Sequence, residues 1–289
     1  MTDVRIASSP DSVTPAALAQ LRARGEPIVM VTAYDYNSAS IAEAAGVDVV
    51  LMGDSAAMTM LGLASTRLVT LDEMLMLTRA VRRGLTRPLL VGDLPFGSYE
   101  SSNEDAVATA SRFIDAGCGA VKLEGGGAER VDRVRAVVAS GIAVMGHVGL
   151  TPQSTGVGEA FRVQGRTADQ AMRVLEEAKA LEAAGVFAMV FEAIPAGVTE
   201  LLVPRVGVPV IGIGAGPATD GQVLVFDDLV GLATGKPAKF VKRYAETRAE
   251  LVRAVESYRS DVRTRQFPTT AQGYGIDPVE LEELRSRLR

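Results

Sequence analysis

Short apolar segments recur along the chain, and most of them end in glycine or a polar residue. They are rich in valine, isoleucine and other side chains that favour strands. An eighth strand is expected at Gln222–Phe226, although that stretch could also be helical. The seven clear segments are Ile28–Asp35, Val47–Asp54, Pro88–Asp93, Ala120–Glu124, Ile142–His147, Phe187–Glu192 and Val208–Gly214.

Segments with the apolar period of a helix separate several of these strands. Strands alternating with helices of this length predict parallel βαβ units. The helix ends at Gly46, Gly117 and Gly185 look alike, and their spacings of 71 (117 − 46) and 68 (185 − 117) residues suit a repeat of two such units. The expected helices are Leu71–Arg83, Glu104–Ala116, Ala128–Ser140 and Thr167–Ala184.

The alternation favours a (β/α)8 TIM barrel over a doubly wound open sheet. An open sheet usually carries a glycine-rich turn after its first strand, whereas this first strand ends Thr32-Ala33-Tyr34-Asp35. We predict one barrel domain over residues 1–289, with a helical C-terminal extension at about 243–289. An apolar stripe in this tail is expected to pack on the barrel or on a neighbouring subunit; its members are Leu251, Val255, Tyr258 and Val262.

Composition narrows the partners and the chemistry. The chain has 289 residues, 47% of them hydrophobic, and a net charge of −5 without a basic run, which argues against nucleic acid. The apolar runs are too short for a membrane span, and the polar start of the chain predicts a cytoplasmic protein. One cysteine and one histidine cannot form a disulfide or a closed zinc site, so any metal site should be oxygen-rich and suit Mg²⁺.

Polar side chains follow five of the predicted strands. The carboxyl ends of barrel strands form the active-site face, so these side chains should converge there. Gathered carboxylates repel one another unless a cation lies among them, which favours a divalent ion. Glu192 follows an apolar run and is the candidate general base. The full set is Asp54, Ser55, Asp93, Lys122, Glu124, His147 and Glu192.

Each of these residues also has a purely structural interpretation. Asp54 and Asp93 could cap the helices that follow their strands. Lys122 and Glu124 lie two apart on one strand face and could form a structural ion pair. A lone histidine such as His147 is more often a hydrogen-bonded core residue than a catalyst. The run Gly212–Gly216 is a weak signal for nucleotide binding.

Nine stretches in order resemble the ketopantoate hydroxymethyltransferase (3-methyl-2-oxobutanoate hydroxymethyltransferase) family. This family belongs to the barrel superfamily of phosphoenolpyruvate mutase and isocitrate lyase, and the run 145–154 is the most specific match. The stretches are Val31–Asp35, Gly53–Ser55, Val69–Met74, Asp93–Phe96, Val121–Gly126, Met145–Ser154, Val163–Arg166, Ile211–Gly216 with Asp220–Val225, and Lys239–Tyr244.

The resemblance implies transfer of a hydroxymethyl group from 5,10-methylenetetrahydrofolate to 3-methyl-2-oxobutanoate, giving 2-dehydropantoate through a Mg²⁺-stabilised enolate. It implies that Asp54, Asp93 and Glu124 surround Mg²⁺. Ser55 and Lys122 would bind the oxo acid together with Asp54, Asp93 and His147, and Glu192 would accept the proton. It also implies a homo-oligomer, a decamer in the family.

The chain departs from the family pattern at several places. They include Ala56-Ala57, Leu68, Leu77 and Glu159-Ala160, which were expected near the mouth of the barrel. These changes motivate an alternative, a Mg²⁺-dependent lyase or aldolase that cleaves a C–C bond of another small 2-oxo acid. A barrel that binds a metabolite or partner without catalysis is a third hypothesis.

Overall fold

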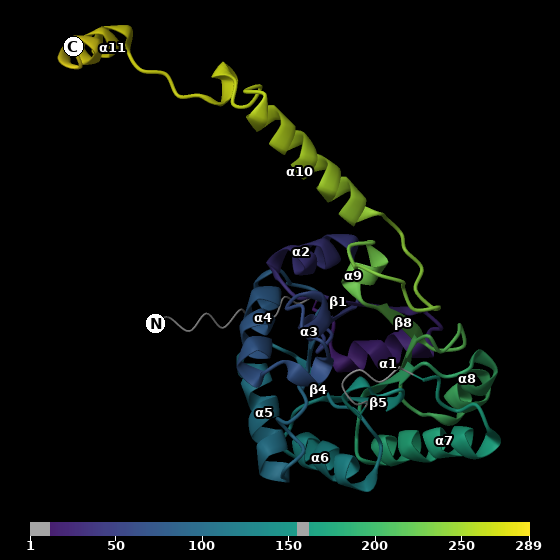
Figure 1. Ribbon diagram of the computed structural model, residues 1–289. Coiled ribbons are helices and arrows are strands. Elements are labelled where there is room, and N and C mark those ends of the chain that lie inside the picture. Colours follow the sequence, from purple (N-terminus) through teal and green to yellow (C-terminus); the bar gives the residue numbers. More distant parts are fainter. Residues whose placement is uncertain (1–11, 155–161) are drawn as a thin grey trace.

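Eight parallel strands close into a barrel in chain order, so the prediction of a (β/α)8 barrel is confirmed. The computed structural model describes residues 12–154 and 162–289 (Figure 1). The eighth strand begins at Gly221, and Phe226 already starts a helix. The strands are β1 Ile28–Thr32, β2 Val49–Met52, β3 Leu89–Asp93, β4 Ala120–Lys122, β5 Val144–Gly149, β6 Ala188–Glu192, β7 Val210–Ile213 and β8 Gly221–Leu224.

Helices surround the barrel, and the four that the sequence predicts are present to within one residue at each end. Helices α1, α2 and α8 were not predicted. Helix α1 places Leu18 in the interior of the barrel among strand side chains. The helices up to the last strand are α1 Pro15–Ala23, α2 Tyr36–Ala45, α3 Ala56–Thr59, α4 Leu71–Arg83, α5 Asn103–Asp115, α6 Ala128–Ala139, α7 Ala168–Ala183 and α8 Ala196–Leu202.

Local side-chain chemistry sets the ends of these helices. Helix α4 begins with a capping box, in which the Thr70 N–H donates to Glu73 at 2.8 Å and the Glu73 N–H donates to the Thr70 hydroxyl at 3.3 Å. The repeated glycines Gly46, Gly117 and Gly185 have φ values of 74°, 102° and 98°. Only glycine adopts this left-handed conformation without strain, which explains their recurrence before a strand.

Side chains alternate along each strand, and this alternation positions the functional residues. One set of every second residue fills the barrel interior with apolar groups, among them Val91, Ala120, Met145 and Val190. The next residue in the same inward register is polar on four neighbouring strands. These residues are Asp93, Lys122, His147 and Glu192. The barrel therefore places a cluster of acidic and basic side chains at the carboxyl end of its apolar core.

The C-terminal segment leaves the barrel. Helix α9 (Phe226–Leu229) is followed by α10 (Thr247–Arg263) and α11 (Pro278–Arg287), and α10 extends away from the barrel wall (Figure 1). The Tyr244 N–H donates to the Leu229 carbonyl at 2.8 Å, which ties the start of this segment to the end of α9. The stripe residues on α10 are exposed, with Leu251 at 52% and Val262 at 44%, so the expectation that the stripe packs on its own barrel is wrong. Within the described residues, no helix is both long and apolar enough to cross a membrane.

Candidate functional site

An ammonium group bridges two buried carboxylates at the carboxyl end of the barrel. The Lys122 Nζ lies 2.7 and 2.9 Å from the two oxygens of Asp93 and 3.4 Å from Glu124 Oε1. All three residues are at most 3% exposed. The pairing of Lys122 with Glu124 that the strand spacing predicted is present, but the closer contact is with Asp93 on the neighbouring strand.

An imidazole lies between Glu124 and a further carboxylate, that of Glu192. The His147 Nδ1 is 3.4 Å from Glu124, and its Nε2 is 3.3 Å from Glu192. Within the described part of the chain neither nitrogen makes a hydrogen bond of good geometry, so charge attraction dominates these contacts. Burial and Lys122 would lower the pKa of His147, but Glu124 and Glu192 outweigh them and raise it to about 9. The two acids therefore favour the protonated form of His147, which lies between them.

Gln153 links this group to Asp54, although it is not among the site residues that the sequence analysis proposes. It lies in the short turn Pro152–Ser154 after β5 and is 3% exposed. Its side-chain amide donates to Asp54 Oδ2 at 3.0 Å, and its backbone N–H donates to Glu124 Oε2 at 3.0 Å. The Tyr99 hydroxyl donates to its carbonyl oxygen at 2.7 Å, which fixes the orientation of the amide. Its place after a strand end, within the family-like run 145–154, was the signal that could have found it.

Asp54 and Asp93 do not cap helices, so that alternative is wrong. Ser55 and Ser102 precede helices α3 and α5, and the Asp54 N–H donates to the Asp93 carboxylate at 3.2 Å. Burial raises the pKa of Asp54, and the charges of Asp93 and Glu124 raise it further. Burial likewise raises the pKa of Asp93, although Lys122 opposes this effect. The two side chains are neighbours in an environment short of positive charge.

The charge balance of the site fits a bound cation. Four carboxylates, those of Asp54, Asp93, Glu124 and Glu192, face one ammonium and one imidazolium, which leaves two negative charges in excess (four minus two). Their oxygen donors suit Mg²⁺, which takes one or two carboxylates and retains water. Within residues 12–154 and 162–289, no group of three or more potential ligands is arranged around one point. Lys122 already contacts both Asp93 and Glu124, so a three-carboxylate site stays a prediction.

These side chains form the floor of a large cavity. Its volume is about 1390 Å³. Ser55, the seventh predicted residue, also lines this cavity and is half-buried. Glu192 is the more open acid, with its side chain 16% exposed compared with 2% for Glu124. All seven predicted residues therefore lie at one site. The upper wall comes from segments after β7 and β8 and includes Gly214, Asp227, Asp228, Lys239, Phe240 and Arg248.

The departures from the family pattern do not line this cavity where the structure describes them. Ala56 and Ala57 are fully buried, and Leu77 is buried in α4. Leu68 is 48% exposed, and none of these four is among the described residues that line the cavity. Ala56 and Ala57 directly follow Ser55, which lines the cavity, but their own side chains are buried and form no part of its wall. Glu159 and Ala160 lie outside the described residues.

Known proteins similar to this chain belong to the family that the sequence motifs resemble. The family model described as ketopantoate hydroxymethyltransferase matches residues 12–270. The 3-methyl-2-oxobutanoate hydroxymethyltransferase of Moorella thermoacetica is 51% identical over 89% of this chain and 95% of its own. The one of Nitrosopumilus maritimus is 45% identical over 90% of this chain and 93% of its own.

Among solved structures, the same fold occurs in 2,3-dimethylmalate lyase, a member of the phosphoenolpyruvate mutase/isocitrate lyase superfamily. The TM-score is 0.55 at 15% identity, and the match covers 95% of this chain and 99% of that one. This likeness concerns the fold and confirms the expected barrel type. The family match over most of the chain, with the predicted acids, lysine and histidine together at one cavity, means that this chain belongs to the ketopantoate hydroxymethyltransferase family.

Proposed function

We propose that this chain transfers a hydroxymethyl group from 5,10-methylenetetrahydrofolate to 3-methyl-2-oxobutanoate and releases 2-dehydropantoate. One observation carries the proposal: in a chain of this family, four carboxylates, a lysine and a histidine from separate strands meet at the floor of one cavity. The reaction needs a base that removes the C3 proton of the oxo acid and positive charge beside its oxygens. The site contains groups of both kinds.

The exposure and charge of each side chain indicate its proposed role in the reaction. Glu192 is the acid most open to the cavity and is the proposed acceptor of the C3 proton. Lys122 and Ser55 hold the oxygens of the oxo acid, and the positive charge of Lys122 attracts its carboxylate. The His147 imidazolium lies against Glu192 at 3.3 Å and orients that carboxylate, with Glu124 on its other side.

Asp54 and Asp93 are the proposed direct ligands of Mg²⁺, with Glu124 as the third acid around the ion. The support is the excess of two negative charges and the closeness of Asp54 to Asp93. When bound, Mg²⁺ would stabilise negative charge on the substrate oxygen while C3 loses its proton. Gln153 holds the Asp54 carboxylate in place from the opposite side.

The size of the cavity supports a second, larger substrate. Pockets for drug-sized ligands measure about 300–1,000 Å³, and a small oxo acid would fill only a minor part of about 1390 Å³. The cavity lining also includes Phe240, Asp227 and Arg248, which can contact a flat ring and its polar groups. This favours a folate as one-carbon donor over the alternative, a lyase or aldolase that acts on one small 2-oxo acid.

The direct test combines product formation with metal binding. With Mg²⁺, methylenetetrahydrofolate and 3-methyl-2-oxobutanoate, the purified protein is expected to form dehydropantoate, and calorimetry should show bound Mg²⁺. Asp54→Asn should weaken Mg²⁺ binding by at least about tenfold, because even groups behind metal ligands contribute about 10–100-fold. Asp115→Asn, at an exposed acid ending α5, is the control and should bind as the wild type. Folded protein that makes no product would reject the proposed activity.

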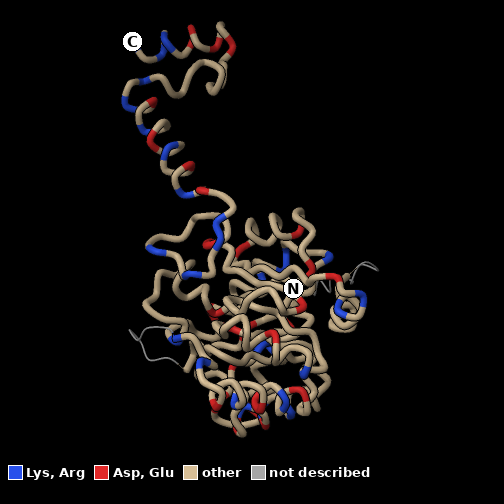
Figure 2. Tube along the Cα trace, turned by 90° about the vertical axis from the view of Figure 1, so that its right-hand side faces the viewer, with Lys and Arg blue, Asp and Glu red and all other residues tan. Residues whose placement is uncertain are grey.

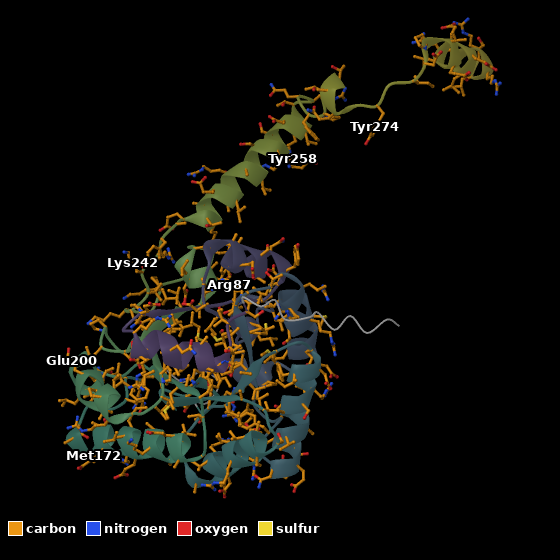
Figure 3. All side chains as sticks on the ribbon, turned by 180° about the vertical axis from the view of Figure 1, so that it is seen from behind. Arg87, Met172, Glu200, Lys242, Tyr258 and Tyr274 are labelled. Atoms are coloured by element: carbon orange, nitrogen blue, oxygen red, sulfur yellow. The ribbon has the colours of Figure 1, made fainter. Side chains whose placement is uncertain are left out.

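We also propose that the chain, as a single domain with its extension, forms a homo-oligomer through α10. Its apolar stripe faces solvent, with Val255 65% and Tyr258 57% exposed. Figure 3 shows Tyr258 and Tyr274 far from the barrel wall, and charges of both signs follow the helix in Figure 2. Meanwhile Val29 on the outer face of β1 is 51% exposed, where a helix after β8 would lie in a regular barrel. A second copy can cover both surfaces, and a decamer is the family's expected assembly.

A charge placed on the stripe should break this assembly. Val255→Asp is expected to shift the protein to smaller species in size-exclusion chromatography with light scattering, because burying an unpaired carboxylate is unfavourable. Ser260→Asp adds the same charge near the opposite side of α10 and should leave the mass unchanged. Equal masses for the wild type and Val255→Asp would contradict the proposed contact.

We place the protein in the cytoplasm, where the buried free Cys118 stays reduced.

A further inference from the structure

Three buried or half-buried hydroxyl groups form a chain of hydrogen bonds beside the acidic site. We propose that Thr32 and Tyr34 orient the Ser55 hydroxyl so that its hydrogen is directed to the ligand, which favours an oxygen acceptor at that point of the substrate. Thr32 and Tyr34 are positioning residues, because they act through Ser55. The inference rests on the proposed function, since it takes the 2-oxo acid as the ligand that Ser55 meets.

The chain crosses three adjacent strand ends of the barrel. The Phe226 backbone N–H, after β8, donates to Thr32 Oγ1 at 2.8 Å. The Thr32 hydroxyl, at the end of β1, donates to the Tyr34 hydroxyl at 2.8 Å. The Tyr34 and Ser55 oxygens, the latter after β2, are 2.8 Å apart. Strands β8, β1 and β2 are direct neighbours, so these links join one side of the cavity.

The direction of the chain follows from the number of hydrogens on each group. A backbone N–H can only donate, so Thr32 Oγ1 accepts from Phe226 and its own hydrogen is free for Tyr34. A phenol has one hydrogen, and because Tyr34 accepts from Thr32, we assign this hydrogen to the 2.8 Å contact with Ser55. The Ser55 oxygen then has an acceptor site occupied from behind, and its own hydrogen is directed elsewhere. Because Ser55 lines the cavity, that hydrogen is available to a ligand.

Burial protects these hydrogen bonds from water. Thr32 is 3% exposed and Tyr34 is 2% exposed, so bulk water does not compete for their hydrogen bonds. Burial also raises the pKa of Tyr34, so the phenol keeps its hydrogen. If Tyr34 lacked its hydroxyl, Ser55 could rotate and present a lone pair to the ligand. A carboxylate or ketone oxygen would then meet an acceptor, which is repulsive.

The chemical consequence is that the site discriminates between ligands that accept a hydrogen bond from Ser55 and ligands that donate one. A 2-oxo acid offers only oxygen acceptors, whereas the corresponding 2-oxo amide can offer an N–H₂ group. With the hydrogen bonds from Thr32 through Tyr34 intact, Ser55 favours the 2-oxo acid. Without them, the preference for acid over amide should shrink, while proton removal by Glu192 should be little affected. This separates an effect on binding from an effect on the chemical step.

The test is a double-mutant cycle on binding of 3-methyl-2-oxobutanoate and on steady-state kinetics. Ser55→Ala should raise the Kd and KM about tenfold, and Tyr34→Phe about fivefold, which is the scale of one hydrogen bond to a charged group. The double variant should bind no more weakly than Ser55→Ala, because Tyr34 acts only through Ser55. The kcat should change less than threefold. Tyr36→Phe, at a 55% exposed phenol, is the matched control.

A second substitution that interrupts the hydrogen-bonded hydroxyl groups guards against a variant that fails to fold. Thr32→Val should weaken binding as Tyr34→Phe does, and Thr32→Ser, which restores the hydroxyl, should recover wild-type affinity. Tyr34→Phe with wild-type Kd, or multiplied effects in the double variant, would overturn the orienting role while leaving the proposed function in place. A folded wild-type protein that binds no 3-methyl-2-oxobutanoate would overturn both.

Discussion

Glu192→Gln is expected to lower kcat by about three orders of magnitude, within the usual contribution of a general base. Glutamine keeps the size and shape of the side chain but cannot accept the C3 proton. The backbone at this position is held on both sides, because Glu192 pairs with Gly149 of β5 and Ile213 of β7. The substitution therefore removes the proton acceptor without moving the strand, and KM should change little.

Deuterium exchange at C3 isolates the step that Glu192 performs. In D₂O, without the one-carbon donor, the wild type should exchange the C3 hydrogen of 3-methyl-2-oxobutanoate, and Glu192→Gln should not. Glu200→Gln removes an acid on the exposed side of α8, far from the cavity floor, and should exchange as the wild type (Figure 3). Undiminished exchange by Glu192→Gln would remove this residue from its role. Exchange with other 2-oxo acids but not this one would favour the lyase or aldolase.

Lys122→Met is expected to reduce the free energy of unfolding by about 3–5 kcal/mol, the usual loss when one partner of a buried ion pair is removed. Methionine fills similar volume but leaves Asp93 and Glu124 buried without their shared ammonium. Both carboxylates are within 3.4 Å of Lys122 Nζ, and their residues are at most 3% exposed. The burial of Glu124 would raise its pKa, and Lys122 and His147 together lower it to about 2, which shows how strongly the charges interact.

Urea unfolding in magnesium-free buffer measures this loss, since a bound ion would mask it. Lys179→Met breaks an exposed pair with Glu182 (2.9 Å) and should cost less than about 1 kcal/mol, the range of surface salt bridges. A loss at Lys122 as small as the one at Lys179 would contradict the view that this ammonium balances the buried acids.

The sequence by itself determined the fold class, because its periodicities are local. Strand and helix patterns alternate with glycine at the helix ends. They predicted seven parallel strands and a candidate eighth, and four helices whose ends are correct to within one residue. It also predicted that Asp93, Lys122, His147 and Glu192 would meet, since the inward register of a barrel strand continues to its carboxyl end. These conclusions needed only chain order and side-chain alternation.

Only the tertiary structure decided which of these groups contact one another. Lys122 pairs more closely with Asp93 from the next strand than with Glu124 two residues away, because the strand register places Asp93 opposite it. Gln153 connects Asp54 to Glu124 across 99 and 29 residues of chain. The hydroxyl chain through Tyr34 spans 194 residues at its first link. The choice of hydrogen-bond partner depends on differences of a few tenths of an ångström in how remote segments are placed. No local pattern in the sequence encodes these differences.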